Sequence, residues 1–194
     1  MPRGSLPHTF LVKIAQNLRS SASKIFELNS YGVYWGFVVI ELDRIDRHIL
    51  QLMQENGRIS NLELADRVGL SPTPCSRRVK QLEESGVIAG HVTLLNPEVL
   101  GLDLTAMVGI SMDRHTPDRF ENFERAINNL PEVLECSIVT GQSADFLLKV
   151  MVRDMRHYEQ FLLGHLTKLE GVTGVHSSFV LRQIVNKTAL PLPI

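Results

Sequence analysis

The chain is poor in the residues that build covalent or metal-bound frameworks, and it has no long apolar run. Only two of its 194 residues are cysteine, Cys75 and Cys136, too few for a disulfide framework or a zinc site, so a reducing cytoplasm fits best. The longest apolar candidate, residues 31–40, is shorter than the roughly 18 residues of a membrane helix, and we expect no membrane partner. With 44% hydrophobic residues and a net charge of −1, the sequence suits an ordinary soluble protein of two small domains.

Residue groupings typical of enzymes are also scarce. His157 and His165 lie eight positions apart, near Glu159, but no aspartate or cysteine at a supporting spacing completes a metal or nucleophile set. We interpret them as solvated helix residues. No glycine-rich phosphate loop precedes a predicted helix, which argues against a nucleotide cofactor. We therefore expect no catalytic residues, no metal site and no cofactor.

What the sequence does contain, in residues 60–88, is a pair of short helices joined by a tight turn. Ser60 and Glu63 have the spacing of a capping box, which predicts that the first helix begins near Asn61. Gly69 then supplies the backbone freedom that a sharp reversal needs. This arrangement is typical of a helix-turn-helix.

The second helix of the pair should begin at once. Ser71 is expected to cap it, Pro72 to open it and Gly86 to end it. Its predicted buried stripe consists of Cys75, Val79 and Leu82. The remaining positions carry residue types that recognition helices use to contact DNA bases and phosphates. The candidate DNA-binding residues are Ser71, Thr73, Pro74, Ser76, Arg77, Arg78 and Lys80. The alternative is a solvated basic patch on an ordinary helix pair.

An upstream amphipathic segment, residues 43–55, supplies a third helix for the same module. We expect a small wing to follow the pair, built from Val87, Ile88, His91 and Val92. Acidic and basic side chains cancel over residues 42–92, so the module is not the strongly basic body of a non-specific binder. Because a single copy makes few contacts, we expect a dimer that reads two half-sites about 34 Å apart.

The second half of the chain alternates between strand and helix patterns. Strands are predicted at residues 104–112, 133–140, 146–152 and 175–185, with helices opened by Pro117 and Asp154. Two strand-helix-strand units with right-handed crossovers predict a ferredoxin-like βαββαβ sandwich, so the chain as a whole is α+β. The strand at 146–152 is apolar on both sides, which favours burial of its open face against another copy. The alternative is an internal strand of a larger sheet.

Four motifs carry a resemblance to a known family: LD..D..IL at residues 42–50, GRIS at 57–60, GLSPTPC at 69–75 and RRVKQLEESGVI at 77–88. Nearly position for position, they resemble the N-terminal winged helix-turn-helix domain of the leucine-responsive regulatory protein/asparagine-operon regulator (Lrp/AsnC) family. The resemblance extends from Leu42 to roughly Pro193. It implies a transcriptional regulator of amino-acid metabolism that binds double-stranded DNA, forms homodimers and assembles further. The phrase SSFVLRQIVNKTALPLP more weakly resembles the members that control amino-acid catabolism, including regulators of branched-chain keto-acid dehydrogenase operons.

The resemblance also bears on the loop between the second and third strands. From its residues the loop is either a plain hairpin turn or a site for a small ligand with ammonium and carboxylate groups. In the family a matching Gly…Asp hairpin at a subunit interface holds a free amino acid such as leucine. The candidate effector-binding residues are therefore Thr140, Gly141, Gln142, Ser143, Ala144 and Asp145. Three residues separate Gly141 from Asp145 where the family pattern has two.

These patterns divide the chain into an N-terminal extension (1–41), a DNA-binding domain (42–92), a linker (93–103), a ligand-sensing and oligomerisation domain (104–185) and a tail (186–194). The extension has no counterpart in the family. Three interpretations remain open: upstream sequence that is translated from a misassigned start codon, a genuine N-terminal arm, or a membrane-targeting segment. Two other functions compete with the regulator: an effector-independent architectural DNA-binding protein, and a metabolic enzyme with an accessory helix-turn-helix.

Overall fold

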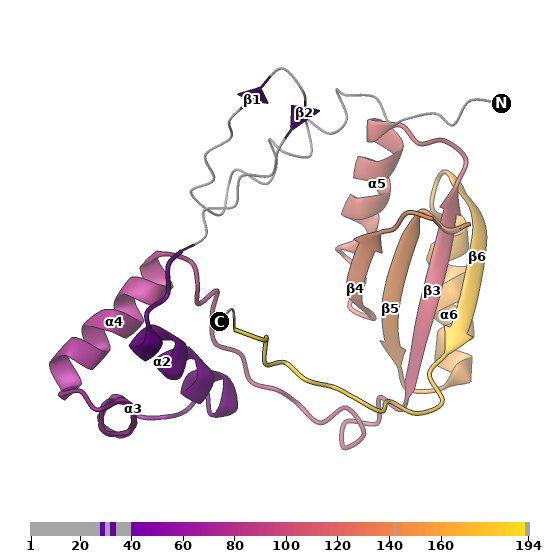
Figure 1. The fold of residues 1–194 in the computed structure, drawn as a ribbon. Coiled ribbons are helices and arrows are strands. Elements are labelled where there is room, and N and C mark those ends of the chain that lie inside the picture. The colour runs from indigo at the N-terminus through magenta and orange to yellow at the C-terminus, as the bar shows by residue number, and fades with distance from the viewer. Residues whose placement is uncertain (1–27, 30–31, 34–39, 142, 193–194) are drawn as a thin grey trace. The chain divides into compact units, whose positions relative to one another are not determined.

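A computed structural model describes residues 28–29, 32–33, 40–141 and 143–192. The chain forms two compact units, one from the residues up to Thr93 together with those from Asn186, the other from Leu94–Val185. Figure 1 shows the helices of the first unit and the sheet of the second. Most of the N-terminal extension lies outside the described residues. Within it are two antiparallel strands of two residues, β1 (Leu28–Asn29) and β2 (Gly32–Val33).

The first unit contains the three predicted helices. They are α2 (Arg44–Glu55), α3 (Asn61–Val68) and α4 (Pro72–Glu84). Their apolar faces meet in one core, where Ile49, Leu64 and Cys75 are almost fully buried. Burial of one such aliphatic side chain contributes roughly 1.5–3 kcal/mol, so this core is the main source of stability for a small module.

Local caps explain where α2 and α3 begin. The Asp43 carboxylate accepts a hydrogen bond from the Asp46 N–H, and the Asp46 carboxylate accepts one from the Asp43 N–H, which makes a reciprocal capping box. At α3 the hydroxyl half of the predicted box forms, because Ser60 Oγ accepts from the Glu63 N–H. The Glu63 carboxylate instead lies 2.9 Å from Arg67, one turn along the same helix. The unpredicted cap at α2 is thus the more complete of the two.

Glycines set the turn and the end of α4 as predicted. Gly69 caps α3 with a φ of 72°, a left-handed conformation that favours glycine. Gly86, with a φ of 76°, follows the last residues of α4. The segment 87–92, expected to form a wing, contains no strand in the described structure. Val87 and Ile88 pack instead against the helical core, and the Ile88 N–H donates to the Leu82 carbonyl, so these residues close the core.

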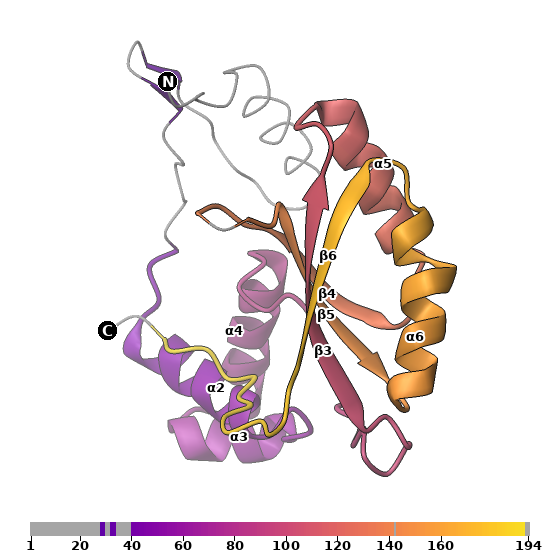
Figure 2. The same cartoon turned by 90° about the vertical axis from the view of Figure 1, so that its right-hand side faces the viewer.

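The second unit is a four-stranded sheet with its helices on one face. Along the chain it contains β3 (Leu104–Met112), α5 (Pro117–Ile127), β4 (Val133–Ile138), β5 (Phe146–Val152), α6 (Met155–Gly164), the 3-10 helix η2 (Leu166–Lys168) and β6 (Val172–Phe179). The strand order is β4-β5-β3-β6, and all neighbours are antiparallel. Figure 2 shows α5 and α6 on the same side of the sheet. The predicted βαββαβ order is confirmed.

The two faces of the sheet differ in character. Toward the helices, β5 buries Phe146, Leu148, Val150 and Val152 almost completely, and the Phe146 ring packs against the rings of Phe120 and Phe123 of α5. On the open face, Leu147 and Met151 are half-buried and flank Lys149, which pairs with Glu135 at 3.1 Å. The open face is therefore more mixed than the sequence pattern of β5 suggested.

Two predicted strands differ in their bounds. The last strand covers residues 172–179 instead of 175–185, because β3 supplies pairing partners only as far as the rung between Ala106 and Phe179 and one further hydrogen bond from Val180. The apolar residues after Val180 thus have no strand beside them to complete a ladder. The strand at 133–140 ends at Ile138, just before the backbone turns at Gly141 with a φ of 82°.

Candidate nucleic-acid interface and effector loop

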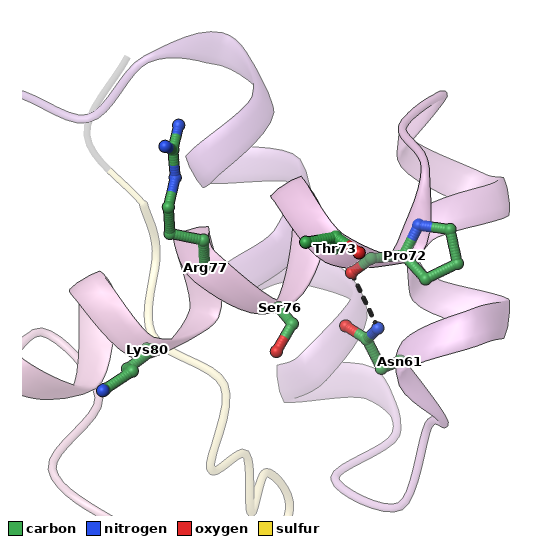
Figure 3. Close-up of a pocket in the computed structure, with 6 residues that line it drawn as sticks. All are labelled: Asn61, Pro72, Thr73, Ser76, Arg77 and Lys80. Atoms are coloured by element: carbon green, nitrogen blue, oxygen red, sulfur yellow. Dashed lines mark hydrogen bonds between the residues drawn. The ribbon is translucent and has the colours of Figure 1, made fainter.

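The outer face of α4 brings together four of the candidate DNA-binding residues. Positions 73, 76, 77 and 80 follow the i, i+3, i+4, i+7 spacing of one helix face. Their side chains are exposed, and with two further residues they line an open pocket of about 410 Å3 (Figure 3). The lining residues are Asn61, Pro72, Thr73, Ser76, Arg77 and Lys80. Two hydroxyls, an amide and two cations thus share one surface, a set of donors suited to base edges and phosphates.

Asn61 is a member of this surface that sequence reasoning missed. Its side-chain Nδ2 donates a 2.9 Å hydrogen bond to the carbonyl of Pro72, the first residue of α4 (Figure 3). This bond joins the start of α3 to the start of α4 across the turn. Its only sequence signal was an asparagine at the expected first residue of α3, and local capping rules do not say which distant carbonyl such an amide will reach.

The cations of this surface have little competition from acidic neighbours. Lys80 lies 3.6 Å from Glu84, but both side chains are more than 60% exposed, so the pair contributes at most a few tenths of a kcal/mol. Among the described residues, Arg77 takes part in no ion pair. Positive charge on α4 is therefore available to an anionic partner.

Arg78 lies elsewhere, although it was predicted to contact DNA. Its Nη1 donates hydrogen bonds to Asp43 at 2.7 Å and to Asp46 at 2.8 Å, and only 29% of its side chain is exposed. These hydrogen bonds, that to Asp46 first, raise the pKa of Arg78. The backbone N–H of Asp46, and then the Arg78 guanidinium, hold the pKa of Asp43 below its ordinary value. Arg78 thus joins α4 to the first turn of α2.

The other two candidates on α4 also lie outside the pocket. Ser71 occupies the N-cap position and is exposed, but its side chain makes no capping hydrogen bond. Pro74 is half-buried in the first turn of the helix. The structure therefore separates the seven candidates into four that share one face and three that do not.

The candidate effector loop is fixed to β3 through Asp145. The Asp145 carboxylate accepts a 2.7 Å hydrogen bond from the Met112 N–H and lies 2.7 Å from His115 Nε2. The Asp145 N–H donates to the Ile110 carbonyl, also at 2.7 Å. Both the side chain and the backbone of Asp145 are therefore engaged with the end of β3.

The rest of the described loop follows β3 closely. Ser111 Oγ donates to the Ser143 carbonyl at 2.9 Å. Ala144 is buried, and a Cβ added at Gly109 would lie only 3.1 Å from the Ala144 Cβ, so a larger residue at position 109 would crowd this contact. Gly141 and Ser143 are exposed, Thr140 is half-buried, and Gln142 lies outside the described residues. Ser143 and Asp145 are thus hydrogen-bonded to β3, and Gly141 and Ser143 are the exposed residues of the described part of the loop.

The histidines of α6 have separate surroundings. His157 Nε2 lies 3.6 Å from Glu132, whereas His165 packs beside the Phe161 ring. Within the described ranges, no three His, Cys, Asp or Glu side chains gather as a metal site requires. None of the helices in that part of the chain has both the length and the apolar character needed to cross a membrane.

Two family models match the chain. Residues 42–89 match a model described as winged helix-turn-helix DNA-binding, and residues 105–190 match one described as the Lrp/AsnC ligand binding domain. The first covers α2, α3 and α4, and the second covers the sheet, the candidate effector loop and most of the tail.

Known proteins similar over most of the chain are transcriptional regulators. The leucine-responsive regulatory proteins of Salmonella typhimurium and Escherichia coli are each 45% identical over 150 residues, which is 77% of this chain and 91% of theirs. A solved transcriptional regulator from Neisseria meningitidis in complex with L-Met has a TM-score of 0.75 and 44% identity, covering 78% of this chain and 97% of that one. An AsnC family regulator from Agrobacterium tumefaciens has a TM-score of 0.73 and 37% identity, with coverages of 77% and 97%.

Proposed function

This chain belongs to the Lrp/AsnC family of DNA-binding transcriptional regulators with an amino-acid ligand-binding domain, and we propose that the outer face of α4 reads its operator. The observation that carries this proposal is the shared exposed face of Thr73, Ser76, Arg77 and Lys80. A helix in the major groove presents such a face to base edges.

The side chains of this face have different tasks in the proposal. Arg77 reads a base, because a guanidinium matches the two acceptors of a guanine edge. Lys80, one turn further along, neutralises a phosphate, and the hydroxyls of Thr73 and Ser76 donate to the backbone or to base edges. Asn61 holds the first turn of α4 in position through Pro72. Arg78 has no direct task at the DNA, because its guanidinium is already bonded to α2.

The proposed effector is a small free amino acid bound by the loop 140–145. Similar proteins support this class of ligand, since one set is named leucine-responsive and one solved regulator is described as an L-Met complex. The contacts of Asp145 support a locking role, because its carboxylate already holds Met112 and His115. Thr140, Ser143 and the Gly141 backbone are then the groups left to face the ligand.

The proposal includes a homodimer that assembles further and a place in the cytoplasm, where a prokaryotic regulator meets its operator. The half-buried Leu147 and Met151 on the open face of the sheet are the proposed contact with a second copy. Similar proteins are transcriptional regulators, and we assign the chain no catalytic activity.

Fluorescence anisotropy with promoter DNA, with and without leucine or methionine, tests this function. We expect specific binding that changes about 5- to 150-fold with the amino acid, as 1–3 kcal/mol of coupling between sites gives. Asp145→Ala should lose this response and keep operator binding, because Asp145 and α4 belong to different units. Equal affinity for unrelated DNA, with no amino-acid effect, would favour the architectural alternative.

A further inference from the structure

The tail of the chain returns to the DNA-binding unit and docks on α2. Gln54 Nε2 donates to the Leu190 carbonyl at 3.2 Å, and the Leu190 N–H donates to Gln54 Oε1 at 2.6 Å. Two residues further on, Leu192 packs against the helical core beside apolar residues of α2. Residues 186–192 therefore group with α2, α3 and α4, although they follow the sheet unit in the sequence.

The mode of docking resembles one rung of a sheet. The Gln54 amide satisfies both backbone hydrogen-bonding groups of Leu190, as a neighbouring strand does. The side chain of Leu190 is 73% exposed, so recognition at this residue rests on its backbone. Leu192 lies two residues after Leu190, which is the repeat of side-chain direction in an extended chain, and it packs against the helical core.

The tail is also a second covalent route between the two units. The first crossing is at residues 93–94 and the second at 185–186. The second route begins directly after β6, whose rungs pair Gly174 with Ser111 and Val172 with Met112 on β3. Ser111 and Met112 are, with Ile110, the residues of β3 that hold the candidate effector loop, through Ser143 and Asp145. The loop is thus connected to the tail by the paired strands β3 and β6 as far as Phe179, and beyond it by the exposed residues 180–189.

At the other end of this connection, α2 is tied to the recognition helix. The tail holds Gln54 near the C-terminal end of α2, and Arg78 of α4 holds Asp43 and Asp46 at its beginning. We propose that residues 186–192 are a clasp that transmits the state of the effector loop to α4 through α2. The proposal rests on the function proposed above for loop 140–145 and adds the segment that couples it to DNA.

The test compares two glutamines of the same helix in the full-length chain. Gln54→Ala removes both hydrogen bonds to the tail, whereas Gln51→Ala removes only a bond to Glu55 within α2. Hydrogen–deuterium exchange read by mass spectrometry should show faster labelling of the 186–192 segment in Gln54→Ala and wild-type labelling in Gln51→Ala. Leu192→Ser, which leaves α2 intact, should reproduce the Gln54→Ala result and guards against a folding defect.

The functional arm uses operator anisotropy with leucine and with methionine. We expect the ratio of affinities with and without amino acid to fall toward one in Gln54→Ala and Leu192→Ser, and to keep its wild-type value in Gln51→Ala. Unchanged labelling of the tail in both clasp variants would overturn the docking. Faster labelling with a wild-type ratio would overturn the coupling. A wild-type chain that responds to no amino acid would overturn the effector function and the coupling together, while the labelling result would still decide the docking.

Discussion

Replacement of Arg78 by alanine should destabilise the DNA-binding unit while leaving the side chains of the proposed DNA-facing surface in place. The substitution removes two charge-assisted hydrogen bonds, to Asp46, which is 17% exposed, and to Asp43, which is 49% exposed. Bonds to charged groups contribute about 1.5–3 kcal/mol when buried, but exposed ion pairs contribute only about 0.2–1 kcal/mol. With the exposure of Asp43 discounted for screening, we expect a loss of about 1–2 kcal/mol. For a domain of this size, each kcal/mol lowers the melting temperature by about 4–8 °C.

The loss should depend on pH. The pKa of Asp43 is lowered in the folded state first by the Asp46 backbone N–H, which Arg78→Ala keeps, and then by Arg78. The contribution from Arg78 to the free energy of unfolding is complete above the unfolded pKa, about 3.9, and disappears as pH falls through the folded pKa. Thermal unfolding followed by circular dichroism, from pH 7 to pH 2.5, measures this. The difference between wild type and Arg78→Ala should be constant at neutral pH and shrink below about pH 4.

Arg77→Ala is the matched control for this experiment. Arg77 is the adjacent arginine of the same helix, it is exposed, and it has no ion-pair partner in the described part of the chain. For Arg77→Ala we expect a wild-type melting temperature and weakened operator binding. For Arg78→Ala we expect a lowered melting temperature and, at temperatures where it is folded, wild-type operator binding. An Arg78→Ala protein that has the melting temperature of wild type but fails to bind the operator would refute the structural role of Arg78. Arg78 would then be a DNA-binding residue.

Three further results are expected. Lys80→Ala should reduce the slope of log affinity against log salt by about one unit in anisotropy titrations, because one phosphate contact is lost; an unchanged slope would place Lys80 outside the interface. Gly171→Ala should lower the melting temperature, since Gly171 has a φ of 89° and an added Cβ would lie 2.9 Å from Asp113 Oδ1; wild-type melting would contradict this. Residues 94–185 expressed alone should be at least dimeric in light scattering at micromolar concentration, and a monomer would argue against the proposed contact through the open face of the sheet.

The helical unit was predictable because its signals are local. Ser60, Pro72 and Gly86 fix helix ends through contacts within a few residues, and the buried stripe of α4 follows from helical spacing. The roles of the two adjacent arginines were harder to separate. Arg78 stands three residues after Cys75 and four before Leu82, at the edge of the buried stripe, which was a usable signal. The partner carboxylates, 32 and 35 residues upstream, were not readable from spacing.

The end of the last strand and the docking of the tail depend on contacts with residues far away in the sequence, which the local pattern of apolar and polar residues does not show. Residues 181–185 were included in the predicted strand because three of the five are apolar, yet β3 offers no ladder to them. The contact of Gln54 with Leu190 spans 136 residues, and its recognition of backbone leaves no side-chain pattern to find. At the effector loop, the sequence pointed to Asp145 but not to its binding of Met112 and His115.

The return of residues 186–192 to α2 means that the DNA-binding unit is assembled from two segments of the chain that are separated by the whole of the sheet unit. Domains generally fold as they leave the ribosome, N-terminal first. Here the three helices can pack early, but Gln54 and the core lack Leu190 and Leu192 until the sheet unit has been synthesised. A chain that stops after β6 would therefore keep the described helices and strands and still lack the contacts that Leu190 and Leu192 make with the DNA-binding unit.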